Sequence, residues 1–203
     1  MSEPPVKRKY DASSRRAAAA ATQDRICAAA EELFVRHGYG STSIRAVAKA
    51  AGVAEATVYL AFPNKAALLD AVILRAVRDN PSERLDSVAA APAAEVLPRL
   101  AASNAVLMAR AAPLIALGES ASLMYAELRP LRERAHRNLR AAFRVIADRL
   151  DAAGRLRVGA PEAAETLYAI VSETTYLRAG LAPDRYARWL AETLGAALLR
   201  QSQ

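Results

Sequence analysis

The sequence has few of the residues that build disulfides, metal sites and β-strands. Its 203 residues include one cysteine, Cys27, and two histidines, so an internal disulfide is excluded, and no Cys/His cluster has the spacing of a zinc site. Aromatic residues make up only 5% of the chain and glycine only 8 residues, whereas alanine is abundant. Because this balance favours helices over strands, we expect an all-α protein in a reducing compartment.

Long apolar runs are also missing. A membrane-spanning helix needs about 18 apolar residues without charge, and the alanine run at residues 17–21 is far shorter. The first residues turn basic without the apolar segment of a secretory signal. No glycine-rich phosphate loop and no nucleophile beside an evident base are present, so we expect neither an enzyme nor a bound cofactor or metal. These absences predict a cytoplasmic protein without membrane association.

Basic residues outnumber acidic ones. The formal net charge is +7 and the pI about 9.9, which suits a polyanionic partner but also an ordinary arginine-rich surface. The excess is locally concentrated at residues 7–9 and 15–16, ahead of the first periodic segment. We therefore predict that residues 1–21 form a basic, largely disordered arm.

Two short helices around a glycine follow the first helix. That first helix is predicted from Thr22, which is placed to cap it, to Gly38, with His37 on its apolar face, although the stretch from Ser13 to Ala21 could extend it upstream. A cap at Thr42 or Ser43 starts the second helix, which stops at Gly52. Since glycine adopts the positive φ that such a turn requires, this arrangement indicates a helix-turn-helix.

The rest of the chain is also helical in pattern. A third helix is predicted from near Glu55, and Asn64 is placed to cap a fourth over residues 65–79. A weakly patterned joint follows, rich in alanine and proline. Beyond it, periodic spacing with prolines near starts and glycines at stops predicts helices over residues 93–111, 114–127, 130–153, 161–179 and 183–200.

The segment from Thr42 to Lys65 carries a specific pattern. It reads TSIRAVAKAAGVAEATVYLAFPNK and is followed by Leu68 and Leu69. On these residues the chain resembles the tetracycline-repressor (TetR) family over about residues 22–73. The sequence departs from the family where Ser or Thr, Gly and His are frequent, because alanine stands at all three positions: Ala54, Ala56 and Ala61.

The resemblance implies an architecture and a function. It implies a three-helix DNA-binding domain over residues 22–67 and a larger helical domain over residues 68–203, which binds an effector and dimerises, with residues 65–79 as the connecting helix. The implied function is a sequence-specific transcriptional repressor, which a small lipophilic effector releases from a palindromic operator in double-stranded DNA. An architectural or partner-controlled DNA-binding protein without a small-molecule switch is the alternative.

The resemblance also implies DNA contacts. The third helix would be the recognition helix, with Tyr59 on a phosphate and four residues near base edges: Glu55, Ala56, Thr57 and Leu60. Glu55 could equally serve the helix dipole. Backbone or groove-edge contacts are implied for Thr42, Ser43, Arg45 and Lys65. Because the departures remove a cap and a phosphate contact, we expect the arm to add affinity through phosphates or a minor groove, using Lys7, Arg8 and Lys9.

Two further sets of residues are implied in the C-terminal region. Candidates for the effector pocket, each of which could instead be plain core, are Met108, Met124, Tyr125, His136, Phe143, Tyr168 and Tyr176. A homodimer is expected because a palindromic operator requires two-fold symmetry. Its interface is predicted on the last two helices, whose stripes could also pack on the chain's own core, at Leu167, Ile170, Val171, Thr174, Tyr186, Leu190, Leu194 and Leu198.

Overall fold

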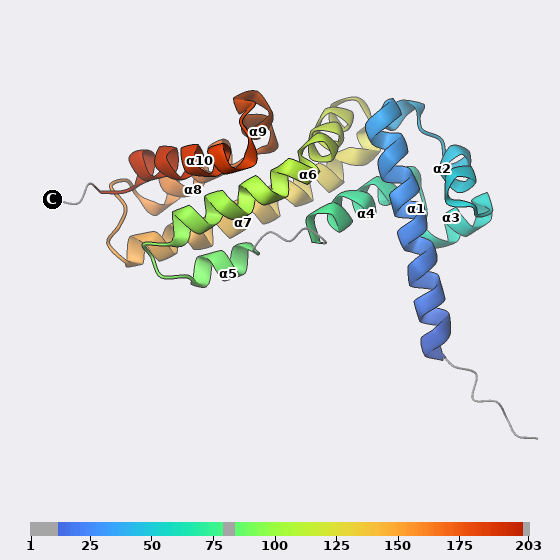
Figure 1. Ribbon diagram of the computed structural model, residues 1–203, viewed down its shortest axis with the longest axis horizontal. Helices are drawn as coiled ribbons and strands as arrows, with labels where there is room; N and C mark the ends of the chain where they lie inside the picture. The colour runs from blue at the N-terminus through green and yellow to red at the C-terminus, as the bar shows by residue number, and fades with distance from the viewer. Residues whose placement is uncertain (1–11, 79–83, 201–203) are drawn as a thin grey trace, which may run out of the picture.

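The computed structural model describes residues 12–78 and 84–200, and these residues form an elongated, all-helical protein (Figure 1). In chain order the helices are α1 (Ala12–Ser41), α2 (Ile44–Ala51), α3 (Glu55–Ala61), α4 (Lys65–Arg78), α5 (Leu85–Ala90), α6 (Val96–Met124), the 3-10 helix η1 (Ala126–Leu128), α7 (Arg129–Ala152), α8 (Ala160–Ile170), α9 (Glu173–Ala179) and α10 (Pro183–Leu198). Helices α1 to α3 lie at one end of the molecule, α4 leads away from them, and α5 and α7 to α10 surround α6 at the other end. The predicted all-α architecture with an N-terminal helix-turn-helix is confirmed.

The helix-turn-helix is shaped by local chemistry. Ser43 caps α2, because its Oγ accepts a hydrogen bond from the Ala46 backbone N–H at 3.1 Å. Gly52 ends α2 in the left-handed conformation with φ 67° and ψ 38°. Asn64 Oδ1 accepts from the Ala67 N–H at 2.8 Å and so caps α4. Both caps lie where the sequence places them.

Helix α1 includes the upstream extension that the sequence left open as an alternative to a start at Thr22. It starts at Ala12, and Thr22 lies inside it, where its hydroxyl donates to the Ala18 carbonyl at 3.0 Å instead of capping the first turn. The expectation of disorder is therefore wrong for residues 12–21, because alanine, which fills positions 17–21, has the highest helix propensity of the amino acids. Residues 1–11, including Lys7, Arg8 and Lys9, lie outside the described residues. His37 is exposed and does not belong to the buried face of α1.

The C-terminal helices also differ from the prediction. Residues 96–124 form one continuous helix, because Pro113 is exposed between buried neighbours and removes only one internal hydrogen bond. The expected helix over residues 161–179 is broken, since Ser172 starts α9 by accepting from the Thr175 N–H at 3.2 Å. A short helix, α5, lies in the region that sequence analysis treats as a joint.

Two hydrophobic cores share α6. The C-terminal core joins the first half of α6 to α5, α7, α8 and α10, around large buried side chains such as Phe143 and Tyr186. The N-terminal core joins α1 to α4 with η1 and with the second half of α6, through residues that include Leu114 and Ala121. Of the described helices, α6 alone has the length and hydropathy of a membrane span, but half of that stretch is buried, as expected for a central core helix.

Candidate nucleic-acid interface

A shallow hollow of about 470 Å³ opens between the α1–α2 corner, α3 and the start of α4. It is lined by Gly40, Ser41, Thr42, Ser43, Ile44, Arg45, Glu55, Tyr59, Asn64 and Lys65. Six of these are residues that sequence analysis assigns to DNA contact, and Ala56, Thr57 and Leu60 continue the same surface along α3. The fold therefore gathers the candidate DNA-contacting residues at one end of the molecule, on the side of α3 that faces away from the core.

Helix α3 presents unusually exposed apolar side chains. Val58 and Phe62 are buried against α1, α2 and α4, whereas Tyr59 is 52% exposed and Leu60 is 90% exposed. No side chain caps the helix, since Ala54 stands at the cap position. Exposing a leucine and a tyrosine to water brings no benefit to the isolated fold, so a partner surface is the expected use of this face.

The two hydroxyls at the α1–α2 corner have different partners. Thr42 is only 3% exposed, and its Oγ1 donates to the Gly38 carbonyl at 2.8 Å, which closes the end of α1. We therefore assign this hydroxyl to holding the corner, against the sequence prediction of a DNA contact. Ser43 is exposed, and its Oγ uses only an acceptor site for the cap, so its O–H remains able to donate to a phosphate.

Charged groups lie on both sides of the hollow. Arg45 on α2 and Glu55 on α3 approach to 3.9 Å between Nε and Oε1, and both side chains are largely exposed. The Arg45 guanidinium is thus a cationic neighbour of the Glu55 carboxylate, which DNA phosphates would otherwise repel. An exposed pair of this kind contributes little stability, so both groups can exchange partners when a ligand arrives.

Lys65 is half-buried at the edge of the hollow, and its ammonium is held by backbone carbonyls of the protein. Its Nζ donates to the Tyr39 carbonyl at 2.9 Å and to the Thr42 carbonyl at 3.1 Å, and it stands 4.2 Å from the centroid of the Tyr39 ring. Burial lowers the pKa of the Lys65 ammonium, and Glu127 partly opposes this shift. The ammonium thus ties together two backbone carbonyls of the α1–α2 corner.

The same corner is connected to the C-terminal region. The Tyr39 hydroxyl donates to Glu127 Oε1 of η1 at 3.3 Å, and the Tyr39 ring meets the Tyr125 ring edge to face at 5.0 Å. Burial and the Glu127 carboxylate raise the pKa of Tyr39. A Cβ atom on Gly40 would lie 2.1 Å from the Tyr125 hydroxyl, so only glycine allows this approach. Sequence reasoning missed Tyr39 and Glu127, because residues 88 positions apart give no local signal.

The predicted pocket residues do not share one environment. Phe143 and Met108 are buried, Met124 is 75% exposed, and Tyr125 packs on the N-terminal core. The Tyr176 ring meets the Tyr186 ring at 4.8 Å. These candidates therefore do not line a single cavity.

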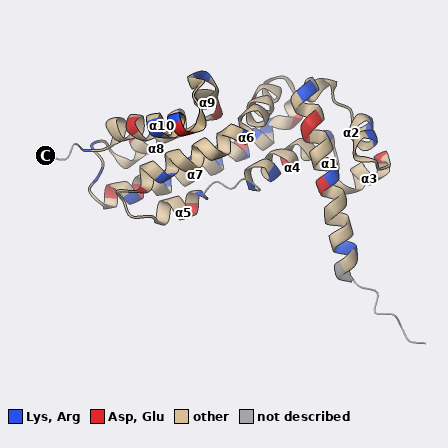
Figure 2. Ribbon diagram, viewed as in Figure 1, with Lys and Arg blue, Asp and Glu red and all other residues tan. Residues whose placement is uncertain are grey.

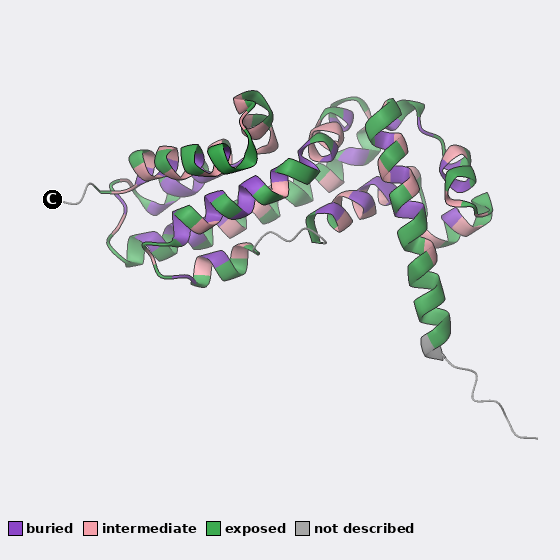
Figure 3. Ribbon diagram, in the orientation of Figure 1, coloured by how far each residue is buried: buried purple, intermediate pink, exposed green. Residues whose placement is uncertain are grey.

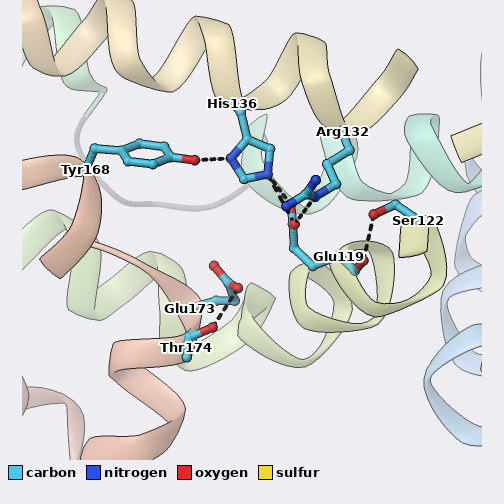
Figure 4. A network of polar contacts seen from close by, with 7 residues as sticks. All are labelled: Glu119, Ser122, Arg132, His136, Tyr168, Glu173 and Thr174. Atoms are coloured by element: carbon cyan, nitrogen blue, oxygen red, sulfur yellow. Dashed lines mark hydrogen bonds and ion pairs between the residues drawn. The ribbon is translucent and has the colours of Figure 1, made fainter. Parts of the chain in front are cut away.

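His136 and Tyr168 do belong together, in a polar network between α6, α7 and α8 (Figure 4). His136 Nδ1 is hydrogen-bonded to the Tyr168 hydroxyl, and its Nε2 lies 3.0 Å from Glu119 Oε1. Arg132 Nε donates to Glu119 Oε2 at 2.7 Å. With a neutral imidazole, Nε2–H donates to the carboxylate and Nδ1 accepts from the phenol. The sequence does not predict Glu119 and Arg132, because charged residues on two different helices give no local signal that they meet.

The predicted dimer stripe faces inward. Leu167, Val171, Tyr186, Leu190, Leu194 and Leu198 are all buried in the chain's own C-terminal core. Only Ile170 and Thr174 of the predicted set keep accessible surface. The prediction is corrected for the six buried residues: an amphipathic stripe shows which side chains are covered but not which chain covers them.

Comparisons with known proteins add a sequence match over the same end of the molecule. Residues 26–72 match the profile of the family described as bacterial regulatory proteins, tetR family. No curated protein matches the chain significantly.

Solved structures resemble the whole fold. NalD of Pseudomonas aeruginosa, the secondary repressor of the MexAB-OprM multidrug efflux pump, is 23% identical with a TM-score of 0.71, covering 92% of this chain and 100% of NalD. SmeT in complex with triclosan is 21% identical with a TM-score of 0.72, covering 90% and 93%. A putative transcriptional regulator from Saccharomonospora viridis in complex with choline is 21% identical with a TM-score of 0.70, covering 90% and 100%.

Proposed function

Because the chain belongs to the tetR family of bacterial regulatory proteins, which regulate transcription and are not enzymes, we propose that it is a ligand-released repressor that holds a palindromic operator as a homodimer. The observation that carries this proposal is the exposed face of α3, with Tyr59 and Leu60 beside a hollow edged by Ser43 and Arg45. An α-helix fits the major groove, where apolar side chains contact thymine methyl groups and polar ones contact phosphates. A cytoplasmic location follows from this role.

The proposed dimer would use the outer surface of α8 to α10. Leu177 is 45% exposed, Trp189 is 36% exposed, and Ile170 and Thr174 are accessible nearby in the sequence. An aromatic ring and aliphatic groups at the surface are typical of the centre of an interface. A two-fold pair of subunits would place two recognition helices about one helical turn apart on DNA.

The proposed effector site lies between α6, α7 and α8, at the polar network of Glu119, His136 and Tyr168. Two relatives were solved with small molecules, SmeT with triclosan and the S. viridis regulator with choline, so this fold accepts both a lipophilic and a cationic ligand. In this chain the Tyr168 ring and the apolar residues of the neighbouring core suit a lipophilic body, while Glu119 and His136 supply polar contacts. We infer a mainly lipophilic effector with a hydrogen-bonding group.

Release from DNA would follow from α6, which contributes to both cores. A ligand that shifts α6 relative to α7 would also move η1, whose Glu127 and neighbouring Tyr125 contact the α1–α2 corner. The ligand need only bind one of two arrangements better than the other. Moving the corner changes where Ser43 and α3 stand, and a dimer binds DNA well at only one spacing of its recognition helices.

The first test is a titration of the purified protein into a labelled DNA fragment from upstream of its own gene, beside a scrambled duplex of equal length. Binding about a thousandfold tighter to the native fragment, weakening with salt, is the expected result for specific recognition. Sequence-specific regulation would be contradicted if the protein bound both fragments equally and if selection from random duplexes also recovered no preferred sequence. The variant Tyr59→Ala serves as the site control, because it removes an exposed side chain of α3 from the proposed DNA-binding surface.

The effector is tested on the protein–DNA complex. Triclosan and choline are the first probes, and a ligand of the proposed kind raises the melting temperature of the free protein and lowers its affinity for DNA. The substitution Tyr168→Phe should weaken the response without changing DNA binding in the absence of ligand. If no compound in a broad lipophilic panel changes either quantity, control by a protein partner becomes the favoured reading.

A further inference from the structure

The first turns of α1 stand clear of the rest of the molecule. Every residue from Ser14 to Ala21 is exposed, and the first buried side chain of the helix is Ile26 (Figure 3). At 1.5 Å per residue, the helical residues 12–21 extend over roughly 15 Å. Figure 1 shows that this extension, residues 12–21 of α1, projects at the end of the molecule that carries α2 and α3.

The composition of the extension is unusual for a docking helix. It contains Arg15 and Arg16 and the alanine run Ala17–Ala21, and its described residues include no acidic side chain (Figure 2). A helix that docks on protein needs a stripe of large apolar side chains, which alanine does not supply. The two guanidinium groups suit a polyanionic partner. The small alanine side chains beside them let the helix backbone approach that partner closely.

We propose that this extension lies along the DNA that flanks the operator and that Arg15 and Arg16 bind backbone phosphates there. The inference rests on the DNA-binding function proposed above. It is supported by position, since α1 carries the extension at its start and, beyond a kink at Gly38 (φ 79°, ψ 166°), reaches Gly40 and Ser41, which line the hollow beside α3. Alanine keeps the segment helical, so the arginines are held at a fixed distance from the recognition surface.

The reach of the extension sets the design of the test. A length of roughly 15 Å corresponds to about four base pairs at 3.4 Å per pair. An operator is first selected from random duplexes with the variant Arg15→Ala/Arg16→Ala, and trimmed to the shortest length that this variant binds fully. A second duplex adds about five base pairs of unrelated sequence on each side. Wild type and variant are then titrated on both duplexes over a series of salt concentrations.

The expected result is a coupling between protein and DNA length. Wild type should gain affinity on the longer duplex, with a salt slope steeper by about 2 per protomer, the value for two phosphate contacts. The variant should bind both duplexes alike. The matched control is Arg144→Ala/Arg149→Ala, which removes two exposed arginines from α7, outside both the proposed dimer surface and the DNA-binding end, and should retain the length effect.

A second variant separates helical presentation from charge. Ala18→Gly/Ala20→Gly keeps both arginines but weakens the helix, and it should lose part of the length effect. The proposal is overturned if wild type gains nothing on the longer duplex, or if Arg15→Ala/Arg16→Ala loses the same affinity on both duplexes. It is also overturned if that variant instead changes the oligomeric state measured by light scattering. Failure to select any duplex would refute DNA recognition itself, a result distinct from these.

Discussion

The two roles considered for Lys65, binding of a DNA phosphate and closure of the α1–α2 corner, predict different results for Lys65→Met. Methionine keeps the apolar stem but removes two hydrogen bonds from a charged donor and the contact with the Tyr39 ring. Each such bond contributes about 1 kcal/mol net at a half-buried site and the ring contact about 0.5 kcal/mol. Because water replaces some of the hydrogen bonds to the freed carbonyls, we expect the free energy of unfolding to fall by about 2 kcal/mol.

The assay combines unfolding with DNA titration. Urea unfolding at a fixed protein concentration should show the loss in stability, and the melting temperature should fall by about 4–8 °C for a chain of this size. The salt slope of DNA binding should stay unchanged, since no phosphate contact is removed. Lys49→Met is the matched control: it removes one exposed lysine from α2 and should leave stability unaltered.

A particular outcome would refute the corner role. If Lys65→Met unfolds at the wild-type urea concentration while its salt slope falls by about 0.9 per protomer, the ammonium binds phosphate instead. A loss of stability together with a reduced slope would show that the lysine serves both purposes. The distinction matters because the family resemblance alone assigns Lys65 to DNA.

Three other substitutions test separate parts of the structure. Ser43→Ala removes the α2 cap and should lower the free energy of urea unfolding by about 1 kcal/mol; an unchanged midpoint would show that the Ser43 side chain does not stabilise α2. Leu60→Ala should leave stability within about 0.5 kcal/mol, because the side chain is 90% exposed, but should alter the sequences recovered in operator selection. Burial raises the pKa of Tyr186 to about 12, so the unfolded chain ionises first and stability should fall between about pH 10 and 12; Tyr186→Phe should reduce that fall, and an identical alkaline profile would disprove it.

Local chemistry made the helix-turn-helix predictable from sequence. The caps at Ser43 and Asn64 and the turn at Gly52 depend on residues within three or four positions, so a short window contains the whole cause. The same holds for the exposure of Leu60, which follows from the helical position of buried Val58 and Phe62. The family resemblance then supplied the expected DNA-binding role for this surface.

Partners distant in the chain were not predictable in this way. An amphipathic stripe indicates that Leu190 and Leu194 are covered, but the covering chain is decided by the packing of α6 against α10. The position of the Lys65 ammonium likewise depends on how α1 and α4 meet. Periodicity also missed the continuity of α6 through Pro113, because an exposed proline interrupts the sequence pattern more than it interrupts a helix that is buried on both sides of it.

Helix α6 has a consequence for how the proposed repressor would switch. Buried residues in both halves of α6 are close-packed, so a displacement at one end cannot be absorbed by empty space at the other. Ion pairs join helix α7 to α4 and to α6, since Arg134 binds both carboxylate oxygens of Asp70 on α4 at 2.7 Å and Arg132 binds Glu119 on α6. An effector that competes for Glu119 would therefore loosen α7 from α6 while leaving it joined to α4, and the resulting shift between α4 and α6 would act on the shared core beneath the recognition helix.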